Sequence, residues 1–263
     1  MVVGADIKET KGSELLWDTS RGSFTLPVYW AALFAKAHMR KYGTTEEQMA
    51  LVAVKNRENA CHNDNAVFRN KISVSDVMNS KKYVEPIKML DCSYICNGAS
   101  AILLTNEEEA KRYTDRPVWI EGIGSSTEGA SFSNVSSDLA CIRSTVTASS
   151  MAFSMTEIGP EQIDVVELHD AFTIMEILAY EDLGFCQKGK GGKFVSENNL
   201  ATNPRGGLIG AGHPLGATGV AQTVEICEQL NGLAGKRQVK DCKIGLVHNM
   251  SAAGSSSLVL ILT

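Results

Sequence analysis

The fold of this 263-residue chain is decided largely by one stretch, residues 206–219, which reads Gly206-Gly207-Leu208-Ile209-Gly210-Ala211-Gly212-His213-Pro214-Leu215-Gly216-Ala217-Thr218-Gly219. Its glycines let the backbone approach a ligand closely and expose N–H groups. His213 stands on a bend that Pro214 stiffens, directly before a predicted helix. An imidazole in such a place suits a general base toward a thiol or an α-carbon. A flexible glycine linker is the alternative, but the adjoining helix and the single imidazole favour a functional loop.

Strands and helices alternate on both sides of this stretch. Before it, apolar runs predict strands at 117–124 and 163–168, a helix at about 138–155 and another through Tyr180. After it, a helix is predicted at about 217–230 and two closing strands at 243–248 and 258–262. Residues 187–215 are interpreted as one long loop, and loops of that length are usually functional or disordered. This order predicts an α/β layer architecture.

The first part of the chain combines loops with short elements. Residues 1–4 read as the end of a short apolar strand, and residues 5–26 as a loop. A helix is predicted from Pro27 to Gly43, and Thr44-Thr45-Glu46-Glu47 resembles the cap of a second helix. Short helices are expected at 75–78 and 107–113. The continuous apolar run 99–104 predicts a strand that is buried on both faces.

Two further clusters are candidates for chemistry. Glu167-Leu168-His169-Asp170-Ala171-Phe172 lies where a strand meets a helix, and ligands of α/β sheets bind at the carboxyl ends of strands. A histidine that caps the following helix explains His169 equally well. Val247-His248-Asn249-Met250-Ser251-Ala252-Ala253-Gly254 joins two strands and could supply backbone donors to an oxyanion. A tight β-turn explains this second cluster equally well.

Composition and charge exclude several classes of function. The chain is 44% hydrophobic and 21% charged, with a formal net charge of −5. The sequence has no basic stripe of the kind that predicts nucleic-acid binding. No apolar run approaches the roughly 20 residues that span a bilayer, and the N-terminus has no secretory pattern, so we expect a cytoplasmic protein. Gly122-x-Gly124 lacks the third glycine of a dinucleotide fingerprint. The seven cysteines are scattered without the spacing of a metal site, so we expect thiols and no bound metal.

Taken together, the three clusters resemble the thiolase superfamily, in particular the sterol-carrier-protein-type and archaeal acetyl-CoA acetyltransferases. His169-Asp170-Ala171-Phe172 resembles the His-Asp-x-Phe motif of the family. Gly212-His213-Pro214-Leu215-Gly216-Ala217-Thr218-Gly219 resembles the Gly-His-Pro motif and is the most specific match. His248-Asn249-Met250-Ser251 lies where the family has its last catalytic loop. Residues 27–113 are also similar, so the resemblance covers nearly the whole chain.

The resemblance implies a thiolase-like layered α/β/α fold, which is built from two similar halves in five layers. Residues 1–117 would be the remainder of the N-terminal half with its inserted loop domain, and residues 118–263 the complete C-terminal half. The family's acylated cysteine lies in a segment further upstream, and none of the seven cysteines here stands in a matching context. The chain is therefore expected to be a fragment or one subunit of a split enzyme.

The resemblance also assigns roles to residues. His213 would activate the nucleophilic cysteine as a base, and His169 would help to form an oxyanion hole through a water. Asn249 stands where many relatives have a second, acid/base cysteine. Ser251 stands where relatives have a glycine whose N–H completes the other oxyanion hole, and Gly254 and Gly212 are expected to bind substrate. Ala171 occupies the other usual place of a second cysteine, which argues against reversible Claisen condensation.

The leading functional hypothesis is an acyl-CoA acyltransferase of lipid metabolism that makes or breaks a carbon–carbon bond beside a thioester. A coenzyme A thioester is then the substrate, and no tightly bound cofactor is expected. A retro-aldolase on coenzyme A esters and a non-catalytic binding or scaffold subunit are the alternatives. The resemblance implies a homo- or hetero-oligomer and a zinc-ribbon and OB-fold protein as partner.

Overall fold

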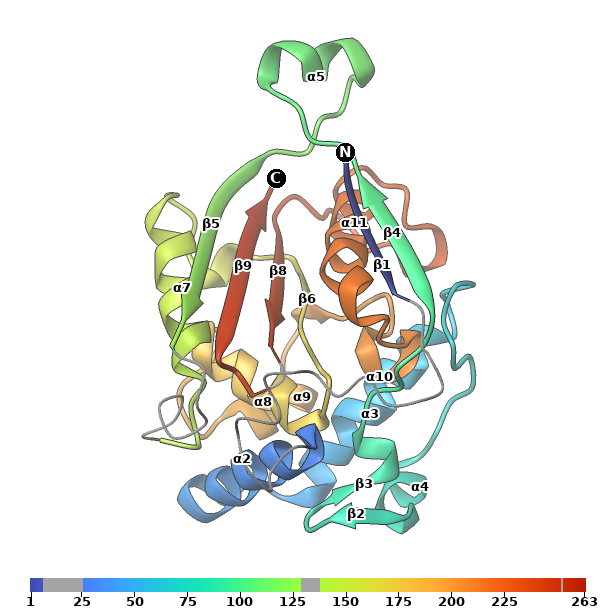
Figure 1. The fold of residues 1–263 in the computed structure, drawn as a ribbon, viewed down its shortest axis with the longest axis vertical. Coiled ribbons are helices and arrows are strands. Elements are labelled where there is room, and N and C mark those ends of the chain that lie inside the picture. The colour runs from blue at the N-terminus through green and yellow to red at the C-terminus, as the bar shows by residue number, and fades with distance from the viewer. Residues whose placement is uncertain (7–25, 129–137, 252) are drawn as a thin grey trace.

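A five-stranded sheet forms the centre of the computed structural model, which describes residues 1–6, 26–128, 138–251 and 253–263 (Figure 1). Its strands lie in the order β5-β9-β8-β6-β7. They span Ile120–Thr127 (β5), Ser256–Leu262 (β9), Gly245–Met250 (β8), Val165–Glu167 (β6) and Ala201–Thr202 (β7). β6 is parallel to β7 and β8, whereas β9 is antiparallel to both of its neighbours.

Helices cover both faces of this sheet. α7 (Arg143–Ser154) packs on β5 and β9, and α11 (Thr218–Leu230) packs on β8 and β6 from the other side (Figure 1). β9 shows why, because its side chains alternate: Val259 and Ile261 join the core on the α7 side, while Leu262 packs with Ile226 of α11. The continuous apolar sequence of β9 therefore follows from a strand that is covered twice.

A second, smaller sheet lies on the far side of α11. β1 (Val2–Asp6) pairs antiparallel with β4 (Gly98–Ile102), and both strands contact α11 (Figure 1). The predicted strand at 99–104 exists, but the expectation that both of its faces are buried is wrong. Ala99 and Ala101 are exposed, because α11 and its preceding turn cover only one side of this sheet. The molecule thus has the layer order helix, sheet, helix, sheet.

The helices of the first part pack beneath the carboxyl ends of the central strands. They are α2 (Pro27–Tyr42), α3 (Glu46–Ala60) and α4 (Val74–Asn79), with a hairpin of β2 (Lys82–Val84) and β3 (Ile87–Lys88). α5 (Glu107–Tyr113) lies at the opposite end of the molecule (Figure 1). The predicted ends are confirmed: Gly43 ends α2 in a left-handed conformation, and Thr45 caps α3 by accepting from the N–H of Gln48. The predicted loop 5–26 lies mostly outside the described residues, and its first two residues belong to β1.

The region predicted as one long loop, 187–215, contains regular structure. It holds α9 (Gly191–Glu197), the short strand β7 and α10 (Gly207–Ala211), so the loop prediction is wrong there. Tertiary contacts rather than local propensity hold these helices. The Glu181 carboxylate accepts from the N–H of Gly191 at 2.8 Å, and the Asp170 carboxylate accepts from the N–H of Leu208 at 2.7 Å. Such long-range caps leave no periodic signal in the sequence.

The remaining predicted elements are confirmed within a few residues. The strands at 117–124, 163–168, 243–248 and 258–262 correspond to β5, β6, β8 and β9, and the predicted helices to α7, α8 (Thr173–Asp182) and α11. Buried side chains from both sides of residue 117, among them Trp30, Phe34, Ile177 and Tyr180, share one core. The domain boundary at residue 117 stays a prediction. None of the described helices has the length and apolar character to cross a membrane.

Candidate active site

The structure brings together two of the histidines predicted from the sequence. His169 follows β6, and His213 follows α10 and precedes α11. Their rings lie edge to face, with centroids 5.1 Å apart and an interplanar angle of 86°. Only 4% of His169 and 8% of His213 is exposed. The expectation that His169 caps the next helix is wrong, because α8 begins after Phe172 without a side-chain cap.

Backbone contacts fix the position of His213. Its N–H donates to the carbonyl of Tyr94 at 2.8 Å, and it forms a parallel bridge with Ile95. Gly212 has φ +101°, and a Cβ there would lie 2.7 Å from Cys96 Sγ and from a Val67 methyl group. Glycine is therefore required before the histidine, for its conformation and for the close approach of two other segments.

The His213 ring has a defined tautomer. Its Nδ1 lies 2.8 Å from Thr218 Oγ1, and the Thr218 hydroxyl donates to the carbonyl of Pro214 at 3.2 Å. A hydroxyl has one proton, so both contacts are made together when the ring donates to Thr218. Nδ1 of a neutral His213 then carries the hydrogen and Nε2 keeps a lone pair, which is the state of a general base.

Burial keeps both histidines neutral. It lowers the pKa of His213 to about 4, with a smaller contribution from the charge of Arg205. Burial also lowers the pKa of His169 well below its usual range, and the neighbouring His213 and His248 lower it further. Both imidazoles can therefore exchange a proton with a bound molecule at neutral pH without starting from a charged state.

Asn249 lies on the same side of the sheet as the two histidines. Its Nδ2 is 3.1 Å from His169 Nδ1 and donates to Gln222 Oε1 at 2.8 Å. Strand alternation sends the preceding residue, His248, to the opposite face, where its Nε2 lies 3.0 Å from Thr145 Oγ1. The structure thus places Asn249 beside His169, and its role in a site stays a prediction. The contacts of Gln222 with Asn249 and of Thr218 with His213 were not predicted from the sequence.

Asp170 holds the two histidine segments together. Its carboxylate accepts from the N–H groups of Leu208 and Ile209 at 2.7 and 3.3 Å, and from Asn56 Nδ2 at 2.7 Å. Burial, with the neighbouring Glu176, raises the pKa of Asp170 to about 6. Because α10 leads directly into Gly212, this carboxylate ties the loop of His213 to the strand end of His169.

In the turn that follows Asn249, backbone N–H groups donate to acceptors within the turn itself. Ser251 N–H donates to the carbonyl of Ser256 at 2.9 Å, and Gly254 N–H donates to the carbonyl of Ser251 at 2.8 Å. The Ser251 hydroxyl also accepts from the N–H of Ser256 at 3.0 Å. This is the arrangement of a tight turn, and the oxyanion role of Ser251 and Gly254 stays a prediction.

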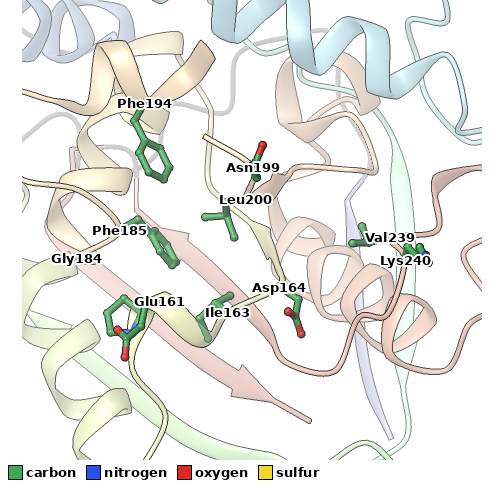
Figure 2. Close-up of a pocket in the computed structure, with 11 residues that line it drawn as sticks. Glu161, Ile163, Asp164, Gly184, Phe185, Phe194, Asn199, Leu200, Val239 and Lys240 are labelled. Carbon is green, nitrogen blue, oxygen red and sulfur yellow. The ribbon is translucent and has the colours of Figure 1, made fainter. Parts of the chain in front are cut away.

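Two cavities lie against the central sheet or the segments next to it. The larger, about 1020 Å³, is mainly apolar and lies between α11, the central sheet and the segment around α5, and it reaches Asn249 and Gly219. The smaller, about 450 Å³, includes Phe185, Phe194 and Asp164 (Figure 2). Asp164 precedes β6, whereas His169 follows it, so the smaller cavity lies at the end of β6 away from His169. The larger cavity is lined by Asn249, whose amide contacts His169.

Most of the cysteines in this chain are poorly suited to act as nucleophiles. Burial raises the pKa of Cys92 and Cys186 to about 12, and that of Cys141 and Cys242 to about 11. The thiolate is the reactive form, so these thiols are almost wholly in the unreactive form at neutral pH. Cys96 is the cysteine that packs beside Gly212.

Comparisons with known proteins identify the family of the chain. A family model described as "Thiolase C-terminal domain-like" matches residues 124–263. "Acetyl-CoA acetyltransferase" of Methanothermobacter thermautotrophicus is 43% identical over 95% of this chain and 66% of the relative. The protein of that name from Methanocaldococcus jannaschii is 32% identical, over the whole chain and 69% of the relative. "Sterol carrier protein 2" of Bos taurus is 37% identical over 86% of the chain and 43% of the relative.

Two solved structures share the fold. One is described as "Ltp2-ChsH2(DUF35) aldolase"; it has a TM-score of 0.86, 25% identity, and coverage of 99% of this chain and 72% of that chain. The other is a monomeric SCP2-thiolase like protein type 1 from Mycobacterium smegmatis, with a TM-score of 0.74, 20% identity, and coverage of 99% and 54%. The second likeness concerns the fold alone.

The chain spans 66% of the first archaeal relative and 43% of the bovine one. Its family match nevertheless covers both closing strands, α11 and both candidate histidines. The predicted thiolase-like layered α/β fold is confirmed by these matches. The chain belongs to the thiolase family, in the group of the archaeal acetyl-CoA acetyltransferases and sterol carrier protein 2.

Proposed function

We propose that this chain takes part in the cleavage or formation of a carbon–carbon bond next to a coenzyme A thioester, as a thiolase-type acyltransferase. One observation carries the proposal: two buried neutral histidines, His169 and His213, lie ring to ring, and Asn249, whose amide contacts His169, lines a cavity. The names of the archaeal relatives support acyl transfer as the reaction class.

His213 is the proposed base. Its Nε2 lone pair would take the proton of a thiol, and the thiolate would attack the keto carbon of a β-ketoacyl thioester. When the carbon–carbon bond breaks, its electron pair forms the enolate of the departing acyl thioester, and a proton then returns to the α-carbon. Burial raises the pKa of Cys92, Cys141, Cys186 and Cys242 and makes them poor donors of this thiol, so we expect it from a segment or partner outside these residues.

His169 is the proposed partner of the thioester oxygen. That oxygen gains negative charge in the enolate, and a hydrogen-bond donor held at the right place stabilises it more than it stabilises the ground state. Fixed donors in a dry site need no reorganisation as the charge develops. His169 therefore supplies electrostatic stabilisation, directly or through a water, while His213 moves the proton.

A retro-aldolase is the second candidate, and two positions in the site favour it. Asn249 and Ala171 occupy the places where the family resemblance expects a second cysteine. Similarity to the "Ltp2-ChsH2(DUF35) aldolase" structure supports this candidate. In that reaction His213 would remove the proton of a β-hydroxyl group, the carbon–carbon bond would break to an aldehyde and an enolate, and the α-carbon would be reprotonated. No thiol is consumed.

A second polypeptide is part of the proposal. The description of the aldolase structure names a second component, ChsH2(DUF35), and the family resemblance implies a small zinc-ribbon and OB-fold partner. We propose a hetero-oligomer of this kind. A non-catalytic binding subunit is the form that the protein takes if no turnover is found with the partner present.

The experiment starts with the protein as isolated, whose native mass identifies any chain that copurifies. Thiolysis of acetoacetyl-CoA and cleavage of a β-hydroxyacyl-CoA are then measured with and without a thiol alkylator. The matched variants are His213→Ala and Cys96→Ser, the second because Cys96 is the cysteine beside Gly212.

Thiolysis that the alkylator abolishes in the wild type and in Cys96→Ser supports the acyltransferase with a thiol from elsewhere. Aldehyde formation that the alkylator leaves intact supports the retro-aldolase. Absence of both reactions with a partner bound contradicts an enzymatic role, and unchanged turnover in His213→Ala contradicts the proposed base.

A further inference from the structure

We propose that one face of α11 assigns the protons of both site histidines: Thr218 directs His213, and Gln222, acting through Asn249, directs His169. Thr218 and Gln222 are four residues apart, so they lie one turn from each other on the same face of the helix. Both side chains are fully buried. Gln222 is thus a positioning residue for the proposed reaction.

The direction of the hydrogen bonds on the His169 side follows from a backbone carbonyl. Gln222 Nε2 donates to the carbonyl of His248 at 3.3 Å, and a carbonyl can only accept. This contact leaves Gln222 Oε1 as the acceptor that faces Asn249, whose Nδ2 lies 2.8 Å away. The Asn249 amide is therefore oriented with its nitrogen toward Gln222.

The same Asn249 nitrogen faces the His169 ring. Asn249 Nδ2 lies 3.1 Å from His169 Nδ1, and an amide nitrogen has two hydrogens and no available lone pair. His169 Nδ1 must then accept, and the neutral imidazole carries its hydrogen on Nε2. Turning the amide of either Asn249 or Gln222 would place like groups against each other, and Gln222 is fully buried.

The two histidines consequently present opposite groups at Nε2. His213 offers a lone pair there, because its Nδ1 donates to Thr218. His169 offers an N–H, because its Nδ1 accepts from Asn249. The functional interpretation of these two tautomers rests on the proposed function, in which His213 is the base and His169 is the oxyanion donor. The tautomers themselves do not depend on any assay of activity.

The position of Asn249 over the helix is also built into the sequence. A Cβ on Gly219 would lie 3.5–3.9 Å from the side-chain atoms of Asn249, so Asn249 rests directly on the first turn of α11. Gln222 follows three residues later and reaches the same amide from the next turn. The helix thus supplies both the surface on which Asn249 lies and the group that orients it.

The test is nitrogen NMR of the imidazole rings in ¹⁵N-histidine-labelled protein at neutral pH, in which protonated and unprotonated ring nitrogens are distinguished. The wild type is expected to show His169 with Nε2–H and His213 with Nδ1–H. Gln222→Met removes the orienting group, so His169 is expected to populate both tautomers. Asn249→Asp presents an acceptor to Nδ1, so the hydrogen of His169 is expected on Nδ1.

Controls separate this effect from general damage. Gln222→Glu keeps an acceptor for Asn249 Nδ2 and is expected to retain Nε2–H on His169. Thr218→Val lies on the same face one turn earlier and is expected to alter His213 alone. Gln229→Glu changes a buried glutamine further along α11 that contacts Glu225 and Arg237, and it is expected to alter neither histidine.

The outcomes decide the two proposals separately. Nδ1–H on His169 in the wild type, or an unchanged tautomer in both Gln222→Met and Asn249→Asp, overturns the role of Gln222 whatever the activity. If the enzyme turns over, kcat should fall about 10²–10³-fold in Asn249→Asp with little change in KM, the loss typical of a missing oxyanion donor. Correct tautomers without turnover would leave the inference standing and count against the proposed function.

Discussion

Two histidine–threonine pairs in this molecule have nearly the same geometry and different surroundings. His38 Nδ1 lies 2.7 Å from Thr44 Oγ1, and His213 Nδ1 lies 2.8 Å from Thr218 Oγ1. The threonine follows the histidine by six residues in the first pair and by five in the second. Each pair joins a helix to the segment next to it.

The two histidines differ in the contacts of their second ring nitrogen, Nε2. His38 Nε2 lies 3.1 Å from both oxygens of Glu181, and the pair is completely buried, which ties α2 to α8. His213 has no ion pair with a carboxylate among the described residues and lies against the ring of His169 instead. A histidine with both nitrogens occupied is part of the framework, whereas one that keeps a lone pair is available for chemistry.

The largest effect on turnover is expected from removing the imidazole ring of His213. His213→Ala should lower turnover in the assays above by about 10²–10⁴-fold, which is the usual contribution of a positioned acid or base. Its melting temperature should fall by only a few degrees, because the ring's hydrogen bond to Thr218 and its contact with His169 are lost but no buried charge is left unpaired. Kinetics and thermal unfolding measured on the same preparation check both parts, and a large fall in stability with normal turnover per folded molecule would reverse the comparison.

His38→Leu should show the opposite pattern. It leaves the Glu181 carboxylate buried without its partner, which typically costs about 3–5 kcal/mol of unfolding free energy. Denaturant unfolding measures this loss, and turnover per folded molecule should stay near the wild-type value.

A double variant, His38→Leu with Glu181→Leu, serves as the matched control for that loss. It should be less destabilised than the sum of the single changes, because no unpaired charge is left buried. Simple additivity would mean that the pair does not act as a unit.

Lowering the pH should reduce the free energy of unfolding through the buried histidines that lack a carboxylate partner. Burial lowers the pKa of His248 to about 4, so between about pH 6.5 and pH 4 the unfolded chain binds a proton that the folded chain does not. Stability from this group is therefore lost as the pH falls, by an amount on the order of 2–3 kcal/mol.

Glu167 acts in the opposite sense, since burial raises its pKa to about 8, so the quantity to measure is the difference between the wild type and His248→Gln. The variant should lose less unfolding free energy than the wild type on going from pH 7 to pH 4.5. Parallel pH profiles for the two proteins would exclude His248 as a source of acid sensitivity.

The smallest effects are expected from the two threonines. Thr44→Val removes one buried hydrogen bond to His38 and should cost about 1–2 kcal/mol of stability without a kinetic effect. Thr218→Val should cost a similar amount and also lower kcat several-fold, because His213 is no longer held in one tautomer. Equal kinetic effects of the two valine variants would remove the distinction between the two pairs.

Much of the fold could be predicted because its signals are local. α2 and α3 carry apolar residues at helical spacing and end at Gly43 or begin at Thr45, and β9 is an apolar run of strand length. α9 and α10 could not be predicted, since the carboxylates that stabilise their first turns come from Glu181 and Asp170, which lie earlier in the chain.

The residues of the candidate site also divide into those that have a local sequence signal and those that have none. His213 was found because glycine and proline mark its bend, and His169 because it follows a strand. Gln222 was missed because its partner Asn249 lies 27 residues away in the sequence, and His169 lies 80 residues from Asn249. The buried face of α11 carries several polar side chains, so Gln222 does not stand out among them in the sequence.

Because Thr218 and Gln222 belong to one helix, a movement of that helix would displace both of the side chains that set the proton positions of the two histidines. Successive residues are about 100° apart around an α-helix, so a slip of α11 by one residue would carry both side chains away from their histidines at once. Neither ring could lose its assignment through such a slip while the other kept it. A ligand or subunit that turned this helix would switch the acid–base pair on and off as one unit.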